Sequence, residues 1–154
     1  MRDPELEADC PGLADEQYEI RSPQDPQYNC IAFAVGDLAH FWYDANVKGY
    51  YWPPGTPGAD TIEGWLKVFS DLGYKETALN DDGLESDCEK VAIYASPEGP
   101  EHVARQKASG VWTSKMGKGH DIDHPTLAAL EGATMGMVVK IMKRKCKDGR
   151  RVLE

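Results

Sequence analysis

The chain has little that would place it in a membrane, in an export pathway or on a nucleic acid. Its apolar runs fall far short of the roughly 20 residues that a membrane-spanning helix needs. The first residues, MRDPELEAD, are acidic and contain no apolar segment, so we expect no signal peptide. Basic residues are scarce as well, because 17 lysines and arginines stand against 26 aspartates and glutamates. A net charge of −9 argues against general nucleic-acid binding, which needs a basic surface.

Cysteine spacing of the kind that marks a metal site or a disulfide framework is also missing. The four cysteines stand at positions 10, 30, 88 and 146. We interpret them as reduced thiols of a cytoplasmic protein. The 154 residues contain no internal repeat and no linker, so we expect a single domain. We divide it into an irregular N-terminal arm (1–27), a core (28–144) and a solvated basic tail (145–154).

Helical periodicity is confined to the first half of the chain. Apolar residues at helical spacing predict a helix over 30–45 and a second one from about 60 to 73, where Gly73 ends it. The period then changes to two, which predicts strands over 74–79, 90–96, 102–108, 111–116 and 135–143. Polar loops are expected at 80–89 and 118–125. Helices followed by an antiparallel sheet of about five strands are typical of an α+β fold.

Cys30 is the first candidate for chemistry. Pro26 disfavours helix just before it, and Asn29 is a suitable N-cap, so Cys30 falls in the first turn of the first helix. Free backbone N–H groups and the helix dipole favour a thiolate at that place. The alternative is a buried cysteine that acts as a small hydrophobic residue.

His102 is the candidate base for this cysteine. It opens a strand directly after a tight turn, and the next strand can place a polar side chain beside it. The register decides which one. A two-residue loop between the strands aims Thr113 and Lys115 at the face of His102, whereas a three-residue loop aims Trp112 and Ser114 there. The sequence leaves both registers open.

The order of these residues resembles the papain-like fold in the compact form of NlpC/P60-type cysteine peptidases. In more detail, the chain resembles a bacterial domain family of unknown function over residues 13–144. The stretches that carry this resemblance are YNCIAFAVGD (28–37), YYWPPG (50–55), LGY (72–74), EKVAIYA (89–95), PEHVARQKASGVWTSKMG (100–117), DIDH (121–124) and LEG (130–132).

The resemblance implies a catalytic role for three residues. Cys30 would be the nucleophile and His102 the base, and the third residue, about a dozen positions after the base, falls near Ser114. A serine can accept a hydrogen bond but does not stabilise an imidazolium as a carboxylate would. His124, Asp121 and Asp123 are therefore alternative orienting groups.

The resemblance also suggests groups that would assist the nucleophile. Lys115 would lower the pKa of Cys30 if it lies nearby. The backbone N–H of Cys30 is the natural first oxyanion donor. Gln24 matches the papain spacing for a second donor, and Tyr28 is the alternative.

The implied function is hydrolysis of a peptide, protein or amide bond, with deamidation or acyl transfer also open, and without a metal or cofactor. Two alternatives remain. The first is a non-catalytic papain-like binding module that uses the aromatic loop at 50–55 as its contact surface. The second is a metal site formed by His120 and His124, which stand four residues apart with Asp121 and Asp123 between them.

Overall fold

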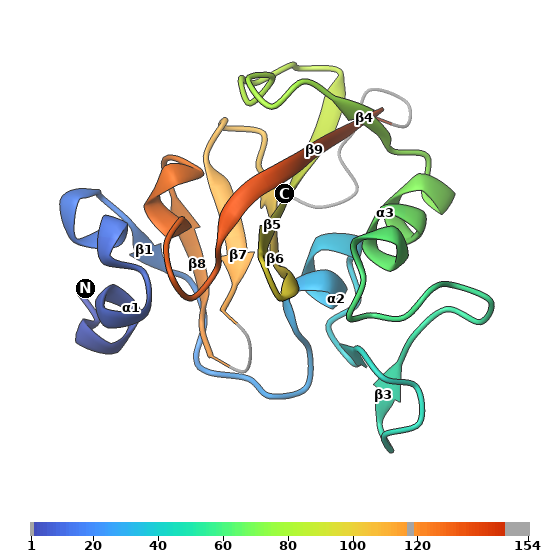
Figure 1. The fold of residues 1–154 in the computed structure, drawn as a ribbon. Helices are drawn as coiled ribbons and strands as arrows, with labels where there is room; N and C mark the ends of the chain where they lie inside the picture. Colours follow the sequence, from blue (N-terminus) through green and yellow to red (C-terminus); the bar gives the residue numbers. More distant parts are fainter. Residues whose placement is uncertain (1, 117–118, 147–154) are drawn as a thin grey trace.

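A seven-stranded antiparallel sheet is the centre of the computed structural model, which describes residues 2–116 and 119–146 (Figure 1). The strand order is β1-β8-β7-β6-β5-β9-β4. Two further short strands, β2 (Phe41–Trp42) and β3 (Tyr50–Tyr51), pair in parallel away from this sheet. The strands of the main sheet are β1 (Glu19–Ile20), β4 (Lys75–Thr77), β5 (Cys88–Ser96), β6 (Gly99–Gln106), β7 (Trp112–Lys115), β8 (Asp121–His124) and β9 (Met137–Lys145).

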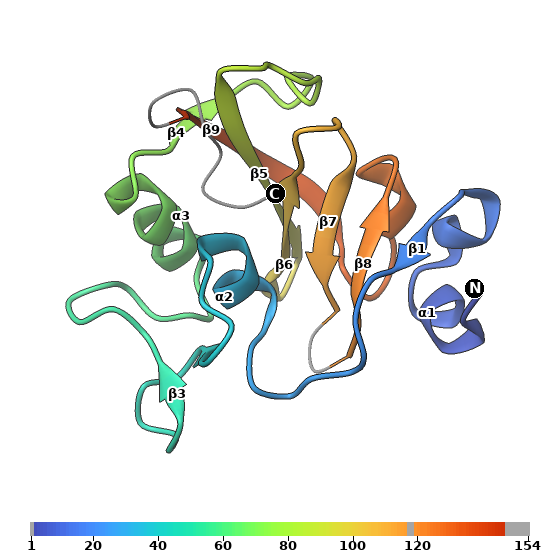
Figure 2. The same ribbon diagram turned by 180° about the vertical axis from the view of Figure 1, so that it is seen from behind.

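Helices cover both faces of the sheet. Helices α2 (Cys30–Val35) and α3 (Ile62–Asp71) lie on one side (Figure 1). On the other side lie α1 (Pro4–Asp9) and the 3₁₀ helices η1 (Pro11–Asp15) and η2 (Ala128–Leu130), as the reverse view also shows (Figure 2). The predicted α+β class is therefore confirmed, with seven strands in the main sheet where about five were expected.

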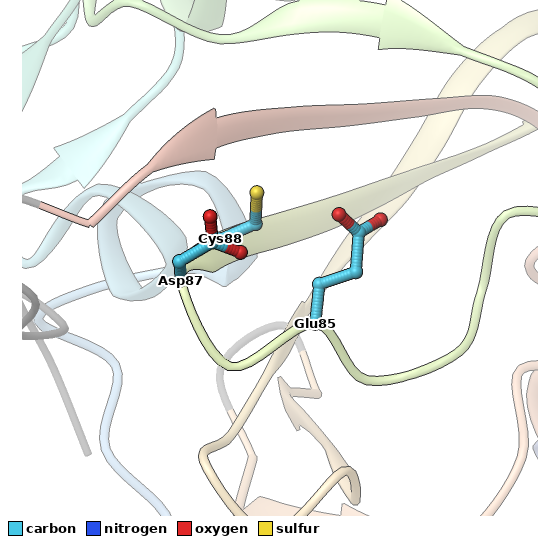
Figure 3. Close-up of side chains that lie close together, drawn as sticks. All are labelled: Glu85, Asp87 and Cys88. Carbon is cyan, nitrogen blue, oxygen red and sulfur yellow. The ribbon is translucent and has the colours of Figure 1, made fainter.

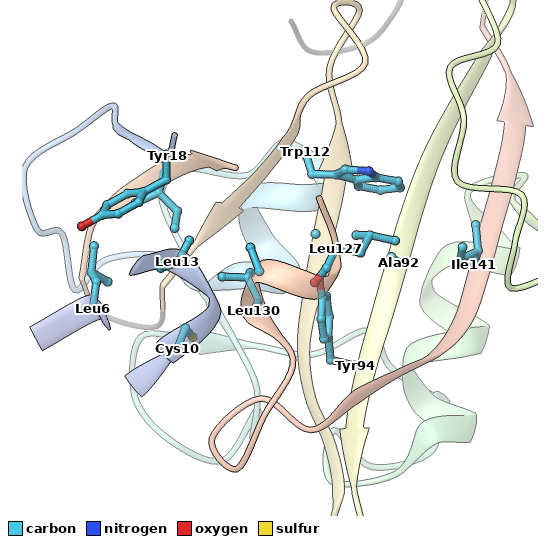
Figure 4. Packing of buried hydrophobic residues seen from close by; sticks show 13 residues of the cluster. Leu6, Cys10, Leu13, Tyr18, Ala92, Tyr94, Trp112, Leu127, Leu130 and Ile141 are labelled. Carbon is cyan, nitrogen blue, oxygen red and sulfur yellow. The ribbon is translucent and has the colours of Figure 1, made fainter. Parts of the chain in front are cut away.

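Each face of the sheet has its own hydrophobic cluster, because successive side chains of a strand point to opposite faces. The helix-side cluster comprises Cys30, Ile31, Ala34, Trp52, Ala59, Trp65, Val68, Phe69, Tyr74, Val91, Ile93, Val103 and Met142. The arm-side cluster, shown in Figure 4, comprises Leu6, Cys10, Leu13, Tyr18, Ala92, Tyr94, Ala104, Trp112, Ile122, Leu127, Ala129, Leu130 and Ile141. Strand β5 contributes to both, and residues 88–94 of it are buried.

The N-terminal arm is more regular than expected. Asp3 caps α1 by accepting hydrogen bonds from the backbone N–H groups of Glu5 and Leu6. Leu6 and Leu13 are buried in the arm-side cluster. The prediction of an irregular arm is therefore wrong for residues 4–15, which close one face of the sheet (Figure 4).

The first predicted helix is too long. It ends at Val35 because Gly36 adopts a left-handed conformation, with φ +97°, and its N–H donates to the carbonyl groups of Ala32 and Phe33. Asp37 then accepts hydrogen bonds from the N–H groups of Ala39 and His40, which starts a turn. The apolar residues after Gly36 therefore continue the helical spacing without forming a helix.

The predicted polar loop at 118–125 is wrong for residues 121–124. They form β8, which pairs with both β7 and β1. Because side chains alternate between the faces of a sheet, Ile122 points to the arm side and is buried in the arm-side cluster. No helix among the residues that the structure describes is long and apolar enough to cross a bilayer. Of the predicted tail, residues 147–154 lie outside the described residues.

Candidate functional site

Cys30 occupies the first position of α2, as predicted. The Asn29 side chain caps this helix, since its Oδ1 accepts a hydrogen bond of 3.2 Å from the backbone N–H of Ala32. The Cys30 thiol is free but only 7% of the residue is exposed, and it packs in the helix-side cluster with Val103 of β6. The cysteine is therefore placed for helix-dipole activation and at the same time removed from solvent.

Burial decides the protonation state of this cysteine. It raises the pKa of the Cys30 thiol to about 11, although the backbone N–H groups of Val103, Ile31 and Cys30 itself hydrogen-bond the sulfur and lower it. The charge of Lys115 lowers it further, by less. The backbone N–H groups at the helix start therefore lower the pKa of Cys30 as expected, but desolvation raises it by more. At neutral pH Cys30 is a thiol.

His102 directs its ring away from Cys30. It follows Pro100 and Glu101 in β6 and is followed by Val103, whose side chain belongs to the helix-side cluster together with Cys30. Because neighbouring residues of a strand alternate, His102 points to the arm side, where its ring lies 5.4 Å from that of Tyr94. Among the described residues, no hydrogen bond joins the Cys30 sulfur to His102. The structure does not assemble the expected cysteine–histidine pair.

Ser114 does lie beside His102. The hairpin between β6 and β7 has the three-residue loop, in which Gly110 adopts φ +92° and the N–H of Lys107 donates to Val111 O. Arg105 consequently pairs with Thr113, which puts Ser114 on the face of His102. The distance from His102 Nε2 to Ser114 Oγ is 2.9 Å. Of the two registers left open by the sequence, this is the second.

Ser114 links His102 to a second buried histidine. Its Oγ lies 2.8 Å from Nε2 of His124, and Nδ1 of His124 lies 2.9 Å from the carbonyl oxygen of Thr126. A carbonyl only accepts, so His124 donates from Nδ1 and its Nε2 accepts the Ser114 hydroxyl proton. His102 Nε2–H must then donate to Ser114 Oγ. In this assignment each of the three hydrogen bonds has one donated proton, and both histidines are neutral.

Both histidines are kept neutral by burial. Desolvation lowers the pKa of His102 to about 3, helped by the proximity of His124, and lowers that of His124 to about 4. His102 is 1% exposed and His124 is fully buried. Both rings are shielded from solvent, and their hydrogen bonds through Ser114 join β6, β7 and β8 on the arm side of the sheet.

Lys115 and Tyr28 lie on the face of Cys30. Lys115 is buried, and its Nζ donates to Asp25 O at 2.6 Å and lies 4.8 Å from the centre of the Tyr28 ring. The Tyr28 hydroxyl donates to Asp121 Oδ2 at 2.9 Å. Burial lowers the pKa of Lys115, whereas Asp121, Asp25 and Cys30 raise it. The structure thus brings Cys30, Lys115 and Tyr28 to one side of the sheet.

Gln24 is placed elsewhere. It is exposed and lines a pocket together with Asp3 and His120, on the side of the N-terminal arm. The predicted oxyanion role for Gln24 finds no support in this placement, and Tyr28 lies on the correct face but directs its hydroxyl to Asp121.

The two histidines of the metal hypothesis are not directed at one point. His120 Nδ1 lies 2.7 Å from Ser22 O, and His124 uses both ring nitrogens within the buried chain. Among the described residues, one group brings three potential metal ligands within 4.8 Å of one another, namely Glu85, Asp87 and Cys88 (Figure 3).

Lysines already neutralise that group. Lys90 Nζ lies 2.9 Å and Lys143 Nζ 3.0 Å from Glu85 Oε1, and Lys145 Nζ lies 3.2 Å from Asp87 Oδ2. These contacts lower the pKa of both carboxyl groups, whereas burial raises that of the Cys88 thiol. A protonated thiol and three ammonium groups oppose binding of a cation, so the two carboxylates drawn in Figure 3 belong to an ion-pair cluster.

Residues 37–52, which we call the aromatic projection, form a feature that the sequence only partly indicated. It contains β2 and β3 and extends away from the main sheet (Figures 1 and 2). The rings of Phe41 and Tyr50 stack with centres 4.6 Å apart, and those of Trp42 and Tyr51 meet edge to face at 4.8 Å. The predicted helix over 30–45 concealed half of it, and Gly36-Asp37 was the signal that could have revealed the chain reversal.

Half of the exposed large apolar side chains among the described residues lie on this projection. Eight large hydrophobic residues are recorded as exposed among the described residues, and four of them belong to it, namely Leu38 (54%), Tyr43 (41%), Val47 (43%) and Tyr51 (40%). Single exposed apolar residues are ordinary, whereas several on one projecting segment indicate an interaction surface.

Comparison with known proteins gives a family and no function. No curated protein and no solved structure matches the chain. One family model, described as a domain of unknown function, DUF7689, matches residues 19–143. The match includes Cys30, the buried histidine chain and the whole aromatic projection. Since it covers most of the sequence, the chain belongs to the DUF7689 family of domains of unknown function.

Proposed function

We propose that this domain is a non-catalytic binding module whose contact surface is the aromatic projection. The observation that carries the proposal is that one projecting segment (Figure 1) exposes four large apolar side chains, those of Leu38, Tyr43, Val47 and Tyr51. A cysteine at the start of a helix that packs on an antiparallel sheet supports a papain-like ancestry for the fold. Its buried thiol supports a use of that fold other than catalysis.

The projection is held in one conformation, which favours binding. The Asn29 side chain donates to Trp42 O and accepts from Trp42 N, and the indole Nε1 of Trp42 donates to Asp37 Oδ2 at 2.8 Å. An isolated pair of two-residue strands would be unstable alone. These tethers fix the aromatic rings before a partner arrives, so less conformational entropy is lost on association.

The partner class that fits is a peptide segment of another protein. Rigid tyrosine and tryptophan side chains give large contact areas at low entropic cost. The strong negative charge of the chain favours a partner that is not acidic. A nucleic acid is disfavoured for the same reason.

Selection of short random displayed peptides against the purified chain tests this proposal. We expect enriched peptides whose binding is weakened about tenfold or more by Tyr43→Ala or Tyr51→Ala. Leu79→Ala is the matched control, because Leu79 is 56% exposed and lies outside the projection. Peptides that bind the two tyrosine variants as tightly as the wild type, or a selection that enriches nothing, would remove the proposal.

Cysteine hydrolysis is the second candidate function. It is favoured by the three backbone N–H groups that converge on the Cys30 sulfur, because donors of this kind also stabilise an oxyanion. The function would require solvent access to Cys30 and a base that reaches it. Iodoacetamide labelling at pH 6, mapped to each cysteine by mass spectrometry, separates the two candidates. Preferential labelling of Cys30 that is lost in His102→Ala supports the hydrolase, whereas labelling in order of exposure supports the binding module.

A further inference from the structure

A pocket opens at the base of the aromatic projection. It has a volume of about 390 Å³ and includes Tyr43, Asp44, Trp52 and Asp60 in its lining. This volume lies in the range of sites that take a small ligand or one large side chain. The pocket therefore extends the apolar surface of the projection into a recess of mixed character.

Two aromatic residues, Tyr43 and Trp52, belong to the lining of this pocket, and the ring of Trp52 is fixed. Trp52 is buried, and its indole Nε1 donates to Pro57 O at 2.8 Å, which orients the ring. Tyr43 is 41% exposed. A planar cation can stack on such rings, and the attraction is strongest for tryptophan and tyrosine.

The lining of the pocket also carries two carboxylates, those of Asp44 and Asp60. Asp44 accepts the N–H of Asn46 at 2.9 Å, which fixes its carboxylate in a turn. Neither Asp44 nor Asp60 forms an ion pair with any residue that the structure describes, in contrast to Glu85 and Asp87 elsewhere in the molecule. The two carboxylates are therefore available to a charged group from outside.

A third acidic residue belongs to a turn that contacts residue 60. A Cβ on Gly99 would stand 3.0 Å from Asp60 O, so the turn between β5 and β6 lies against residue 60. Glu98 is exposed in this turn and has no ion-pair partner among the described residues. The electrostatic field at the pocket thus favours a cation over a neutral or acidic group.

We infer that this pocket receives an arginine side chain of the peptide that binds the aromatic projection. The inference rests on the proposed binding function and names the chemistry of its ligand. A guanidinium combines a flat face, which stacks on Tyr43 and Trp52, with an edge of N–H donors that match carboxylates. A lysine would satisfy the charge but would lack both the flat face and the fork of donors.

The test compares the wild-type chain with Asp44→Asn/Asp60→Asn in the same selection of random displayed peptides. Peptides selected on the wild type are expected to be enriched in arginine relative to the library, and those selected on the double variant are not. Asp15→Asn is the control, because it removes an exposed carboxylate that does not line the pocket. In fluorescence anisotropy, replacing the selected arginine by glutamine should weaken binding to the wild type about tenfold, replacing it by lysine should weaken it less, and neither change should matter for the double variant.

Three outcomes overturn the inference in distinguishable ways. If the selected peptides are not enriched in arginine but their binding still depends on Tyr51, the proposed binding surface is retained and the arginine pocket is refuted. Arginine enrichment that persists in the Asp44→Asn/Asp60→Asn variant places the cation elsewhere and also removes it. A selection that enriches no peptide removes the proposed function together with the pocket.

Discussion

Asn29 holds Trp42 by two backbone hydrogen bonds made with one side chain. Its Nδ2 donates to Trp42 O at 2.8 Å, and its Oδ1 accepts from Trp42 N at 3.1 Å while also capping α2 through the N–H of Ala32. The amide thereby mimics a neighbouring strand toward β2 and an N-cap toward α2. One buried side chain connects the start of the Cys30 helix to the aromatic projection.

Asn29→Ala is expected to destabilise the chain by about 2–3 kcal/mol, because a cap and two hydrogen bonds to the partly buried backbone of Trp42 are lost together. Asn29→Asp separates the two roles. A carboxylate still caps the helix but cannot donate to Trp42 O, so the projection should loosen while α2 remains. Urea unfolding measures the first effect, and tryptophan fluorescence with peptide binding measures the second. Equal urea midpoints for wild type and Asn29→Ala would contradict this account.

The sequence was sufficient for the features that depend on local pattern. The α+β class, the cap at Asn29, the start of the helix at Cys30 and five of the sheet strands follow from periodicity and capping chemistry. The features that it missed depend on contacts between distant segments. The pairing of β8 with β1 joins residues about a hundred positions apart, and it turned a polar loop into a strand.

The candidate site shows the same division more sharply. The contact of His102 with Ser114 depends on the register between β6 and β7, which the length of the loop between them sets. From the sequence, two loop lengths and therefore two registers were possible. Whether His102 would face Cys30 depended on which face of the sheet α2 covers. That choice is made by packing of the helix-side cluster against Val103, and nothing in the spacing of Cys30 and His102 encodes it.

The buried histidine chain predicts a loss of stability in mild acid. The folded-state pKa of about 3 for His102 and about 4 for His124 lies below the usual value near 6.5, so the unfolded chain binds more protons between these limits. The contribution of the neutral histidines to stability is therefore fully present above pH 6.5 and is lost as the pH falls through about 4 for His124 and about 3 for His102. At full titration the loss should reach about 5 kcal/mol for His102 and about 3 kcal/mol for His124.

Urea unfolding between pH 7 and pH 5 isolates this effect, because most carboxyl groups remain ionised there. His124→Gln should flatten the pH dependence, since glutamine can keep a hydrogen bond to Ser114 without titrating. His40→Gln is the control, as it removes a histidine from the exposed surface. A stability that is constant from pH 7 to pH 5 in the wild type would refute the neutral-chain assignment.

Lys90 is expected to be the most sensitive charged residue. It is fully buried, and its Nζ contacts Asp81 Oδ1 at 2.7 Å, Glu85 Oε1 at 2.9 Å and the carbonyl oxygen of Gly83 at 2.8 Å. Lys90→Ala leaves these acceptors and a cavity, and should cost about 3–5 kcal/mol. Lys90→Met fills the space with an apolar stem and should cost less. Lys67→Ala, which breaks an exposed ion pair with Asp71, should change the free energy of unfolding by less than about 1 kcal/mol. Urea unfolding measures all three variants.

Thiol reactivity gives the most direct view of whether Cys30 is poised for chemistry. Burial raises the pKa of Cys10 and of Cys30 to about 11 and also raises that of Cys88, whereas Cys146 is partly exposed. In the native protein at pH 7.5, an aromatic disulfide reagent should therefore react rapidly with one thiol, and the other three should react only as the structure opens. Cys146→Ser should abolish the rapid phase and Cys30→Ser should leave it intact. The reverse result would mean that the helix start activates Cys30 in solution, and the hydrolase would then become the better account of this fold.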